Sequence, residues 1–324
     1  EGFFINSRDE GKVAYLRSLW RLRRLLKQKR YDIIHCHHSF SGVVFMLSGK
    51  WYKTRRLLSY QSDPRNEGGM VLFRVLYLFF NKIILKNKPK NEGWSKIVHL
   101  PNGVNTSFFV PMDKNQCKEK LGLKKSKRYI LFMDSNNRRP CKRIDRFSET
   151  LSILREKYKH FDLEPLVLTN TARNLIPAYI NASDLHLLTS DFEGSPNSVK
   201  ECMACNVPVV STPVGNVNDL LHDVKGSYVA KSFTAEELAE LSDKSLRNGL
   251  VASRDSLTDK ELNIEIVAQK LLNLYADLTE NAPNAMRLPQ PGEHDQSLLQ
   301  SGTDEHPAAG RPMKILLINN CHYR

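Results

Sequence analysis

A chain of 324 residues is long enough for two ordinary domains with hydrophobic cores, and its hydrophobic content of 41% argues against general disorder. The longest apolar segment, residues 70–85, is interrupted by Arg74, Asn81 and Lys82. It falls short of the roughly 20 residues that cross a bilayer, so no transmembrane helix is predicted. The six cysteines lack the density and spacing of a disulfide framework, which favours a reducing, cytoplasmic compartment.

The net charge of +13 is concentrated in the first third of the chain. Up to residue 110 there are 20 Lys and Arg against seven Asp and Glu, an excess of 13, so the remainder is neutral. Much of the excess lies in residues 13–30, where leucines keep helical spacing and another face carries Arg17, Arg21 and Arg24. This basic amphipathic helix is interpreted as a solvated surface helix or as a contact with an anionic membrane surface. No nucleic-acid motif accompanies the charge, so nucleic acid is not an expected partner.

Short apolar runs alternate with helical patterns along the chain, which is typical of parallel α/β units. In the first part of the chain, strands are predicted at residues 33–35, 57–61 and 97–100. A Pro-Asn-Gly turn at 101–103 and a polar stretch after Pro111 then indicate a domain boundary.

A second α/β series follows this boundary. Its predicted elements are, in order, a strand at 129–135, a helix at 143–159, a strand at 165–170, a short helix near 175–181, a strand at 185–190, a helix from Pro196 and a strand at 208–213. Helical patterns at 234–246 and 263–279 close it. The predicted fold class is therefore α/β, with two Rossmann-like parallel-sheet domains at 1–110 and 111–281. Residues 282–312, rich in Pro, Gly and Ser, indicate a linker or disordered segment.

Two glutamates, Glu193 and Glu201, stand eight residues apart around the turn between a strand and a helix. Ligands of open parallel sheets bind beyond the carboxyl ends of strands, often at helix N-termini that attract phosphate. With Ser195 as the N-cap and Pro196 at the first helical position, Glu201 lies about 9 Å along the helix axis. This is roughly the separation of the two sugars in a nucleotide diphosphate sugar. Backbone N–H groups of Asn197, Ser198 and Val199 could then meet the phosphates.

Four segments in order, residues 32–42 ("DIIHCHHSFSG"), 100–111 ("LPNGVNTSFFVP"), 138–147 ("RRPCKRIDRF") and 190–221, resemble the nucleotide-sugar-dependent glycosyltransferases of family 4. This family, also called group 1, has the two-domain GT-B fold. The last segment is similar to the family's element of two glutamates separated by seven residues. The resemblance covers residues 31–221.

The resemblance implies roles for the residues that match the family's motifs. Glu193 would contact the transferred sugar and stabilise the transition state, and Glu201 would bind ribose. Lys142 would neutralise the pyrophosphate leaving group. The family places an arginine five residues before this lysine, where this chain has Asn137; Arg138 is the preferred replacement and Arg139 the alternative, unless both face solvent.

On the first domain, the resemblance points to His37, in the run 35–38, as the residue that faces the transferred sugar across the cleft. The alternative is that these histidines merely cap the end of the strand. Neighbouring residues on a strand point to opposite faces, so the run is not a convincing metal site. No metal ligands and no cofactor are expected, in agreement with the metal-independent chemistry of the family.

The resemblance implies a glycosyltransferase that moves a sugar from a nucleotide diphosphate sugar to a glycan, lipid-linked or other acceptor, with retention of configuration, in polysaccharide biosynthesis. The enzyme is expected in the cytoplasm, with a peripheral position at the inner face of the membrane left open. The alternative is a truncated, inactive chain that binds nucleotide sugars, because the first domain lacks the family's opening strand, helices and glycine-rich loop.

Residues 313–324 begin with a buried-strand pattern that resembles the opening strand of this same family, which suggests a fusion or a permutation. An incomplete parallel sheet exposes a strand edge that invites pairing. We therefore expect residues 315–319 to dock into the first sheet beside the strand at 33–35, in the same chain or a neighbouring one.

Overall fold

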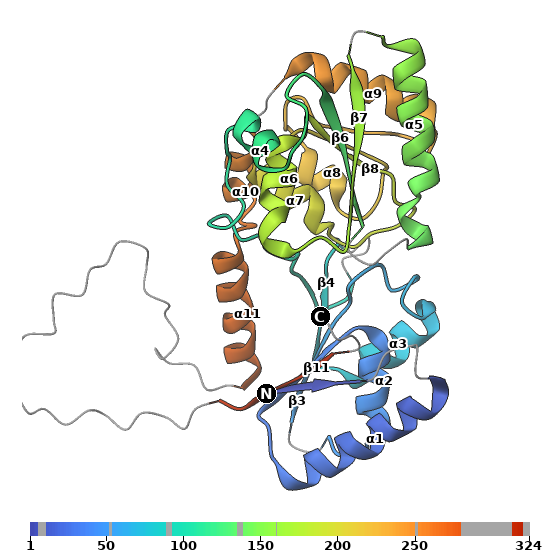
Figure 1. The fold of residues 1–324 in the computed structure, drawn as a ribbon. Helices are drawn as coiled ribbons and strands as arrows, with labels where there is room; N and C mark the ends of the chain where they lie inside the picture. Colours follow the sequence, from blue (N-terminus) through green and yellow to red (C-terminus); the bar gives the residue numbers. More distant parts are fainter. Residues whose placement is uncertain are drawn as a thin grey trace, which may run out of the picture.

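The computed structural model describes residues 1–5, 11–51, 54–88, 93–134, 139–159, 161–249, 252–279 and 313–319. Within these ranges the chain forms two parallel sheets with helices on their faces, which confirms the predicted α/β class (Figure 1). In this part of the chain no helix is both long and apolar enough to span a membrane.

The first sheet has six strands in the order β1-β11-β2-β3-β4-β5, all parallel. The strands are β1 (Gly2–Phe4), β2 (Ile33–His37), β3 (Arg55–Ser59), β4 (Lys82–Leu85), β5 (Ile97–His99) and β11 (Ile315–Asn319). One face is covered by α1 (Gly11–Gln28), α2 (Ser39–Leu47) and α3 (Gly69–Phe79), which share a core with alternate strand residues. Period-two alternation along the strands divides this core from the one on the opposite face.

The opposite face of the first sheet is covered by α11 (Ile264–Thr279), whose Leu274, Tyr275 and Leu278 pack on Ile33 and other strand residues. The prediction that this helix closes the second domain is wrong. Its helical pattern gives it an apolar stripe, which could pack on either sheet. In the structure the chain crosses back to the first domain after α10 (Ser253–Asp259), and the stripe packs on the first sheet. The start of α11 packs closely on the segment that leaves the first domain, because a Cβ added at Gly103 would lie 2.6 Å from the Cα of Ile264.

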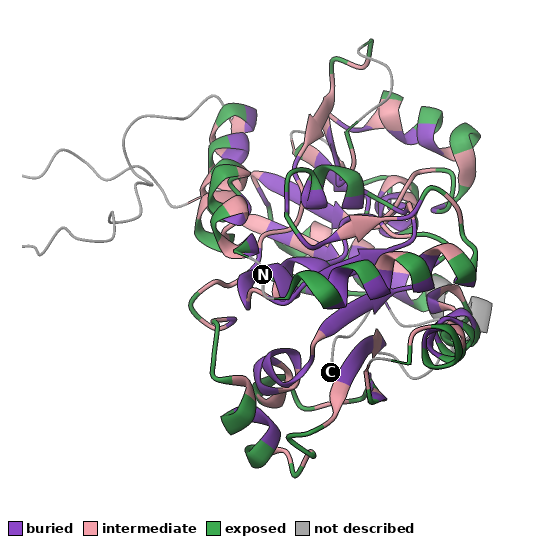
Figure 2. Ribbon diagram, turned by 90° about the horizontal axis from the view of Figure 1, so that it is seen from above, coloured by how far each residue is buried: buried purple, intermediate pink, exposed green. Residues whose placement is uncertain are grey.

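The strand predicted near the end of the chain docks where it was expected. β11 pairs in parallel with β2, with Ile315 opposite Ile33, and in the same chain. Leu316 and Ile318 are fully buried in the first core. In Figure 2, buried residues gather on the strands and exposed residues on the outer sides of the helices. On its other side β11 pairs with β1, a strand that the sequence analysis missed. β11 is thus an interior strand of this sheet rather than an isolated one.

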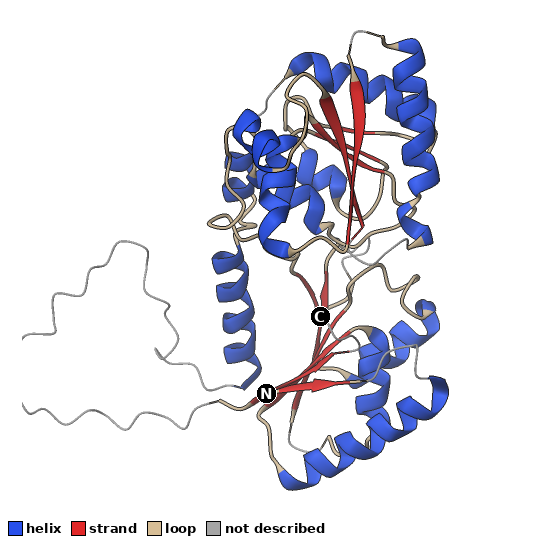
Figure 3. Cartoon of the chain, in the orientation of Figure 1, coloured by secondary structure: helices blue, strands red, loops and turns tan. Residues whose placement is uncertain are grey.

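The second sheet has five parallel strands in the order β10-β9-β8-β6-β7. Figure 3 shows helices (blue) on both sides of its strands (red). The strands are β6 (Arg128–Asp134), β7 (Leu163–Thr169), β8 (Leu185–Leu188), β9 (Val209–Ser211) and β10 (Tyr228–Val229). The helices are α4 (Lys114–Lys120), α5 (Ile144–Lys157), α6 (Ile176–Ala182), α7 (Asn197–Ala204), α8 (Val217–Leu221), α9 (Ala235–Asn248) and α10 (Ser253–Asp259). α5 and α9 share one core, whereas α7 and α8 share the other.

Candidate active site

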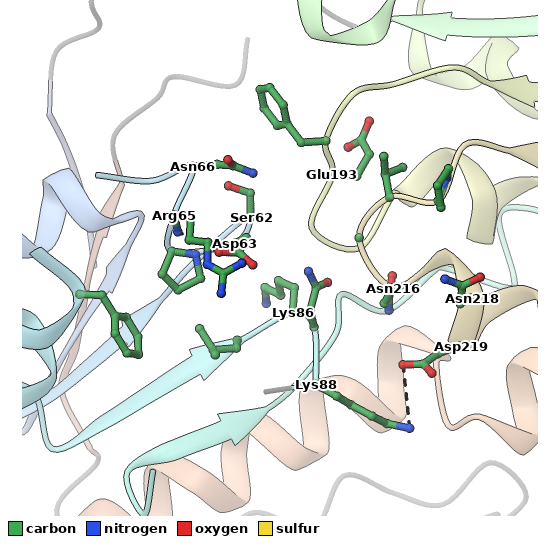
Figure 4. A pocket seen from close by; sticks show the side chains of 18 of the residues that line it. Ser62, Asp63, Arg65, Asn66, Lys86, Lys88, Glu193, Asn216, Asn218 and Asp219 are labelled. Carbon is green, nitrogen blue, oxygen red and sulfur yellow. Dashed lines mark hydrogen bonds and ion pairs between the residues drawn. The ribbon is translucent and has the colours of Figure 1, made fainter. Parts of the chain in front are cut away.

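A cavity of about 630 Å³ lies between the two domains, at the carboxyl ends of strands from both sheets. We call it the interdomain cleft. Its first-domain wall includes residues 62–66 and 85–88, and its second-domain wall includes residues 191–193 and 213–216 (Figure 4). Both walls follow strand ends, where open parallel sheets bind their ligands.

Glu193 lines this cleft, and Lys142, which is far from Glu193 in the sequence and does not line the cleft, contacts its carboxylate. The Nζ of Lys142 lies 2.6 Å from Oε1 of Glu193, and both side chains are largely buried. Ser190 Oγ donates to the same carboxylate oxygen at 2.8 Å. The hydroxyl of Thr189 donates to the backbone carbonyl of Lys142 at 2.9 Å and so fixes the lysine segment to the end of β8. A cation and a carboxylate are thereby held together at one strand end.

Gly194 brings the second domain into contact with the first. A Cβ added at Gly194 would lie 1.9 Å from the carbonyl oxygen of Gln61, closer than real Cβ atoms approach. Gly215, at φ +55°, packs against the same loop, and a Cβ added there would lie 2.3 Å from the carbonyl oxygen of Gly194. The absence of side chains at these two glycines lets the Glu193 loop reach the wall of the first domain.

Helix α7 begins at Asn197 with Pro196 as its N-cap, and no side chain caps it. The prediction that Ser195 is the cap is therefore wrong. The hydroxyl of Ser195 instead accepts a hydrogen bond from Lys200 Nζ at 2.9 Å. Proline is favoured at the first position of a helix, but Pro196 has an extended ψ of 118°. The helix therefore begins one residue later, at Asn197. The first-turn N–H groups of a helix have no partner within it, so those of residues 197–199 remain suited to an anion.

Two of the residues predicted to bind the nucleotide sugar, Ser198 and Val199, are also held in place by their side chains. Ser198 Oγ lies 3.1 Å from Nε2 of the buried His186. Val199 is fully buried in the core, so only its backbone is available to a ligand. Lys200, also fully buried, donates to the carbonyl oxygen of Asn102 at 2.7 Å and so ties α7 to the segment leaving the first domain.

Glu201 lies farther along α7 and does not line the interdomain cleft as the described residues define it. Burial raises the pKa of its carboxyl, and the positive charges of Arg173 and Lys200 oppose this shift. A carboxylate held in a partly desolvated position next to cations is suited to accepting hydrogen bonds from hydroxyl groups. Arg173, which follows the end of β7, was missed because nothing in its local sequence marks it.

At the end of β2, His37 and His38 have different surroundings. His38, at φ 83°, is the N-cap of α2, and its Nδ1 accepts from the N–H of Phe40 at 3.3 Å. His38 therefore caps the start of α2, whereas the alternative had the histidines cap the end of the strand. The His37 ring stacks on His35 with 4.1 Å between centroids. Burial, and then the charge of Lys86, lowers the pKa of His37 to about 4, so its imidazole is neutral at pH 7.

His35 and Glu67 support this end of the sheet. The Nδ1 of His35 lies 2.7 Å from the hydroxyl of Tyr275, and its Nε2 lies 2.7 Å from Ser59 Oγ. Glu67 is 5% exposed, and its Oε1 accepts from the backbone N–H of Gln61 at 2.5 Å. Glu67 therefore fixes the Gln61 turn, which the sequence analysis did not single out.

The arginine prediction is only partly covered by the structure. Arg138 lies outside the described residues. Arg139 donates from Nε to Asp134 Oδ1 at 3.1 Å, and its N–H donates to the other carboxylate oxygen at 2.8 Å. Arg139 is thus held at the end of β6 by an ion pair rather than simply facing solvent. Among the residues that the structure describes, no group of three or more His, Cys, Asp or Glu could hold a metal ion; a metal-independent reaction stays a prediction.

Family models match both halves of the chain. Residues 3–85 match the model described as Glycosyltransferase Family 4, and residues 148–248 match the model described as Glycosyl transferases group 1. This chain is a family 4, or group 1, glycosyltransferase. The first match contains His37, and the second contains Glu193, Asn197, Ser198, Val199 and Glu201.

Relatives and solved structures agree with this family. The glycosyltransferase is 25% identical to an Escherichia coli UDP-Gal:alpha-D-GlcNAc-diphosphoundecaprenol alpha-1,3-galactosyltransferase, over 86% of this chain and 84% of that protein. It is 24% identical to a Campylobacter jejuni N,N'-diacetylbacillosaminyl-diphospho-undecaprenol alpha-1,3-N-acetylgalactosaminyltransferase, over 82% of each.

Among solved structures, sucrose-phosphate synthase from Thermosynechococcus elongatus matches with a TM-score of 0.69 and 15% identity, over 84% of this chain and 80% of that one. Anabaena HepE in complex with UDP matches with a TM-score of 0.64 and 14% identity, over 86% of each chain. At these identities the likeness supports the GT-B fold.

Proposed function

We propose that this glycosyltransferase transfers a sugar from a nucleotide diphosphate sugar to a lipid-linked diphosphate acceptor, with retention of configuration, in the interdomain cleft. The observation that carries this proposal is the contact between Lys142 Nζ and Glu193 Oε1, 2.6 Å apart at the carboxyl end of β8 and facing the first domain. It unites a cation for a departing diphosphate with a carboxylate for the developing positive charge of the sugar.

The donor lies along α7 in this proposal. The diphosphate meets the free N–H groups of Asn197, Ser198 and Val199, where the helix dipole favours negative charge. Lys142 neutralises the leaving diphosphate. Glu201, five residues past the N-cap and so about 7.5 Å along the axis, accepts hydrogen bonds from the ribose hydroxyls. Glu193 remains beside the transferred sugar.

His37 faces the transferred sugar from the first domain. Because its pKa is lowered to about 4, it acts at neutral pH as a hydrogen-bonding imidazole and adds no positive charge beside an electron-poor sugar carbon. The acceptor class follows from the two relatives, whose names both specify a sugar on diphosphoundecaprenol. Such an acceptor brings its own diphosphate into the cleft.

Lys142→Ala and Glu201→Ala are each expected to weaken UDP binding by about 1–3 kcal/mol, because each removes a charged hydrogen bond to the nucleotide. Isothermal titration calorimetry with UDP measures the effect, and Lys124→Ala and Glu240→Ala, at exposed positions, are the matched controls. Unchanged UDP affinity in both test variants would overturn the donor assignment. UDP binding without UDP release from a donor would instead favour the inactive, nucleotide-binding alternative.

The charged face of α1 is the proposed contact with the membrane that holds such a lipid. Leu16 and Trp20 are 59% and 68% exposed, and the exposed face beside them carries Arg17, Arg21 and Arg24. Apolar side chains that enter the interface, flanked by arginines, are typical of helices that lie on anionic membranes.

Binding to liposomes is therefore expected to rise with the fraction of anionic lipid and to fall with salt, because the attraction is screened over about 8–10 Å. Reversal of Arg17, Arg21 and Arg24 to Glu is expected to abolish it in a flotation assay. The control reverses three exposed lysines of the second domain, Lys120, Lys124 and Lys157. Binding that ignores lipid charge, or falls equally in the control, would leave α1 as an ordinary solvated helix.

A further inference from the structure

The interdomain cleft contains charged residues of both signs, and most of them are already paired. On the second-domain wall, Glu193 pairs with Lys142, and Asp191 pairs with Arg143 and Arg146. Lys88 lies 3.9 Å from Asp219 across the cleft. Within the described part of the chain, Arg65 and Lys86 are the lining cations without a carboxylate at ion-pair distance. Both belong to the first-domain wall (Figure 4).

Lys86 is a largely buried cation of the first-domain wall. It follows β4 directly, is 8% exposed, and donates from Nζ to the carbonyl oxygen of Leu100 at 3.2 Å. Burial lowers the pKa of Lys86 to about 8, and Glu67 opposes the shift, so the side chain still carries its charge at pH 7. A buried ammonium with one neutral partner has unused capacity for an anion.

Two further observations, both in the second domain, indicate a ligand between the two walls. Lys200 is fully buried, and its pKa is lowered to about 7 by burial and then by the charge of Lys86, so like charges from the two domains lie near each other. An anion between the domains would relieve this repulsion. Asn216, 4% exposed and lining the same cleft, has an Oδ1 with no hydrogen-bond partner in the described part of the chain. A sugar hydroxyl would supply one.

Helix α3, which contributes to this cleft, also carries exposed apolar side chains outside the cleft lining. Met70 and Phe73 line the cleft, and Val71, Val75 and Leu78, on consecutive turns of this helix, are 78%, 45% and 79% exposed. An exposed apolar stripe on a helix that borders a polar cleft fits a ligand with a charged head and a hydrocarbon tail.

We infer that Arg65 and Lys86 form a diphosphate subsite that holds the diphosphate of the lipid-linked acceptor, with its prenyl chain along α3. This inference rests on the proposed function for the class of acceptor. The donor diphosphate is placed in the second domain, at Lys142 and the start of α7, so the two diphosphates use separate cations. The acceptor sugar then extends from Arg65 and Lys86 toward Asn216 and Glu193.

The test titrates geranyl diphosphate, a short prenyl diphosphate, into the full chain saturated with UDP. Arg65→Gln and Lys86→Met are each expected to weaken its binding at least tenfold, and the double variant is expected to abolish it. Geraniol, which lacks the diphosphate, is expected not to bind measurably. UDP affinity should stay within twofold in every variant. Arg74→Gln, which removes an exposed arginine of α3 outside the cleft lining, is the control for net charge.

Three results would overturn the subsite: unchanged affinity for geranyl diphosphate, an equal loss in Arg74→Gln, or a parallel loss of UDP affinity, which would assign these cations to the donor. Thermal unfolding guards against misfolding, because Lys86→Met removes a buried charge and should not lower Tm. If the unmodified protein fails to bind UDP, the proposed function falls. Titration of geranyl diphosphate alone into the same variants still decides the subsite.

Discussion

Glu193→Gln is expected to lower kcat by about 10²–10³-fold while UDP affinity changes little. In the proposed reaction the carboxylate acts on charge that develops only in the transition state, and loss of one such electrostatic contact has effects of this size. Gln has the same shape, so Ser190, 2.8 Å from the carboxylate oxygen, keeps a partner. Lys142, 2.6 Å from that oxygen, loses its counter-charge and remains free to meet the nucleotide.

The measurement pairs steady-state kcat with UDP affinity from calorimetry, and Glu240→Gln on the exposed side of α9 is the matched control. An equal loss of kcat and UDP affinity would place Glu193 in ground-state binding of the donor. Full turnover in Glu193→Gln would remove it from the reaction altogether.

The alternation of apolar runs and helical patterns predicted most strands of both sheets but missed β1, β4 and β10. Strands buried on both faces are near-continuous apolar runs, and β6 has one at residues 129–133, whereas β2 and β8 are apolar apart from their histidines. The docking of residues 315–319 was predictable for the same reason, because such a strand is stable only inside a sheet. β1 was missed, since three residues are too few for a pattern to be seen.

Segments whose partners are remote were predicted less well. Residues 70–85 form one apolar run in the sequence, but they divide into α3 and β4, both of which bury side chains in the same core. The sequence predicted the apolar stripe of α11 but not the sheet that the stripe covers. Hydrophobic periodicity shows which face of a helix is buried, but it does not show which element packs on that face.

The same distinction applies to the candidate site, where residues in sequence motifs were predicted and residues that depend on contacts between the domains were not. Glu193 and Lys142 came from motifs at strand ends, and the fold brings them into contact. Arg65 and Lys86 could not be found in that way. They stand out only because they remain without a carboxylate partner when the two domains are in contact. In the sequence, a basic run such as residues 86–90 resembles any solvated loop. The same holds for Gly194, whose neighbour Gln61 lies in the other domain.

Gly194→Ala is expected to lower kcat by about 10²-fold with UDP affinity preserved within threefold. The new Cβ would lie 1.9 Å from the carbonyl oxygen of Gln61 and 2.9 Å from its carbon, and both are backbone atoms that cannot rotate away. Gln61 is itself held, because its N–H donates to the buried Glu67 at 2.5 Å. The two domains must therefore move apart, and a displacement near 1 Å between reacting groups costs about this much rate.

Gly93→Ala is the matched control, since a Cβ there would meet nothing within 4 Å and its backbone, like that of Gly194, does not lie at positive φ. Thermal unfolding of Gly194→Ala should show an intact fold, because the clash lies between domains and not within a core. UDP should still bind, because its proposed contacts all belong to the second domain. Unimpaired turnover in Gly194→Ala would mean that the approach of Gly194 to Gln61 is not part of the catalytic arrangement, and that donor and acceptor react with the domains farther apart.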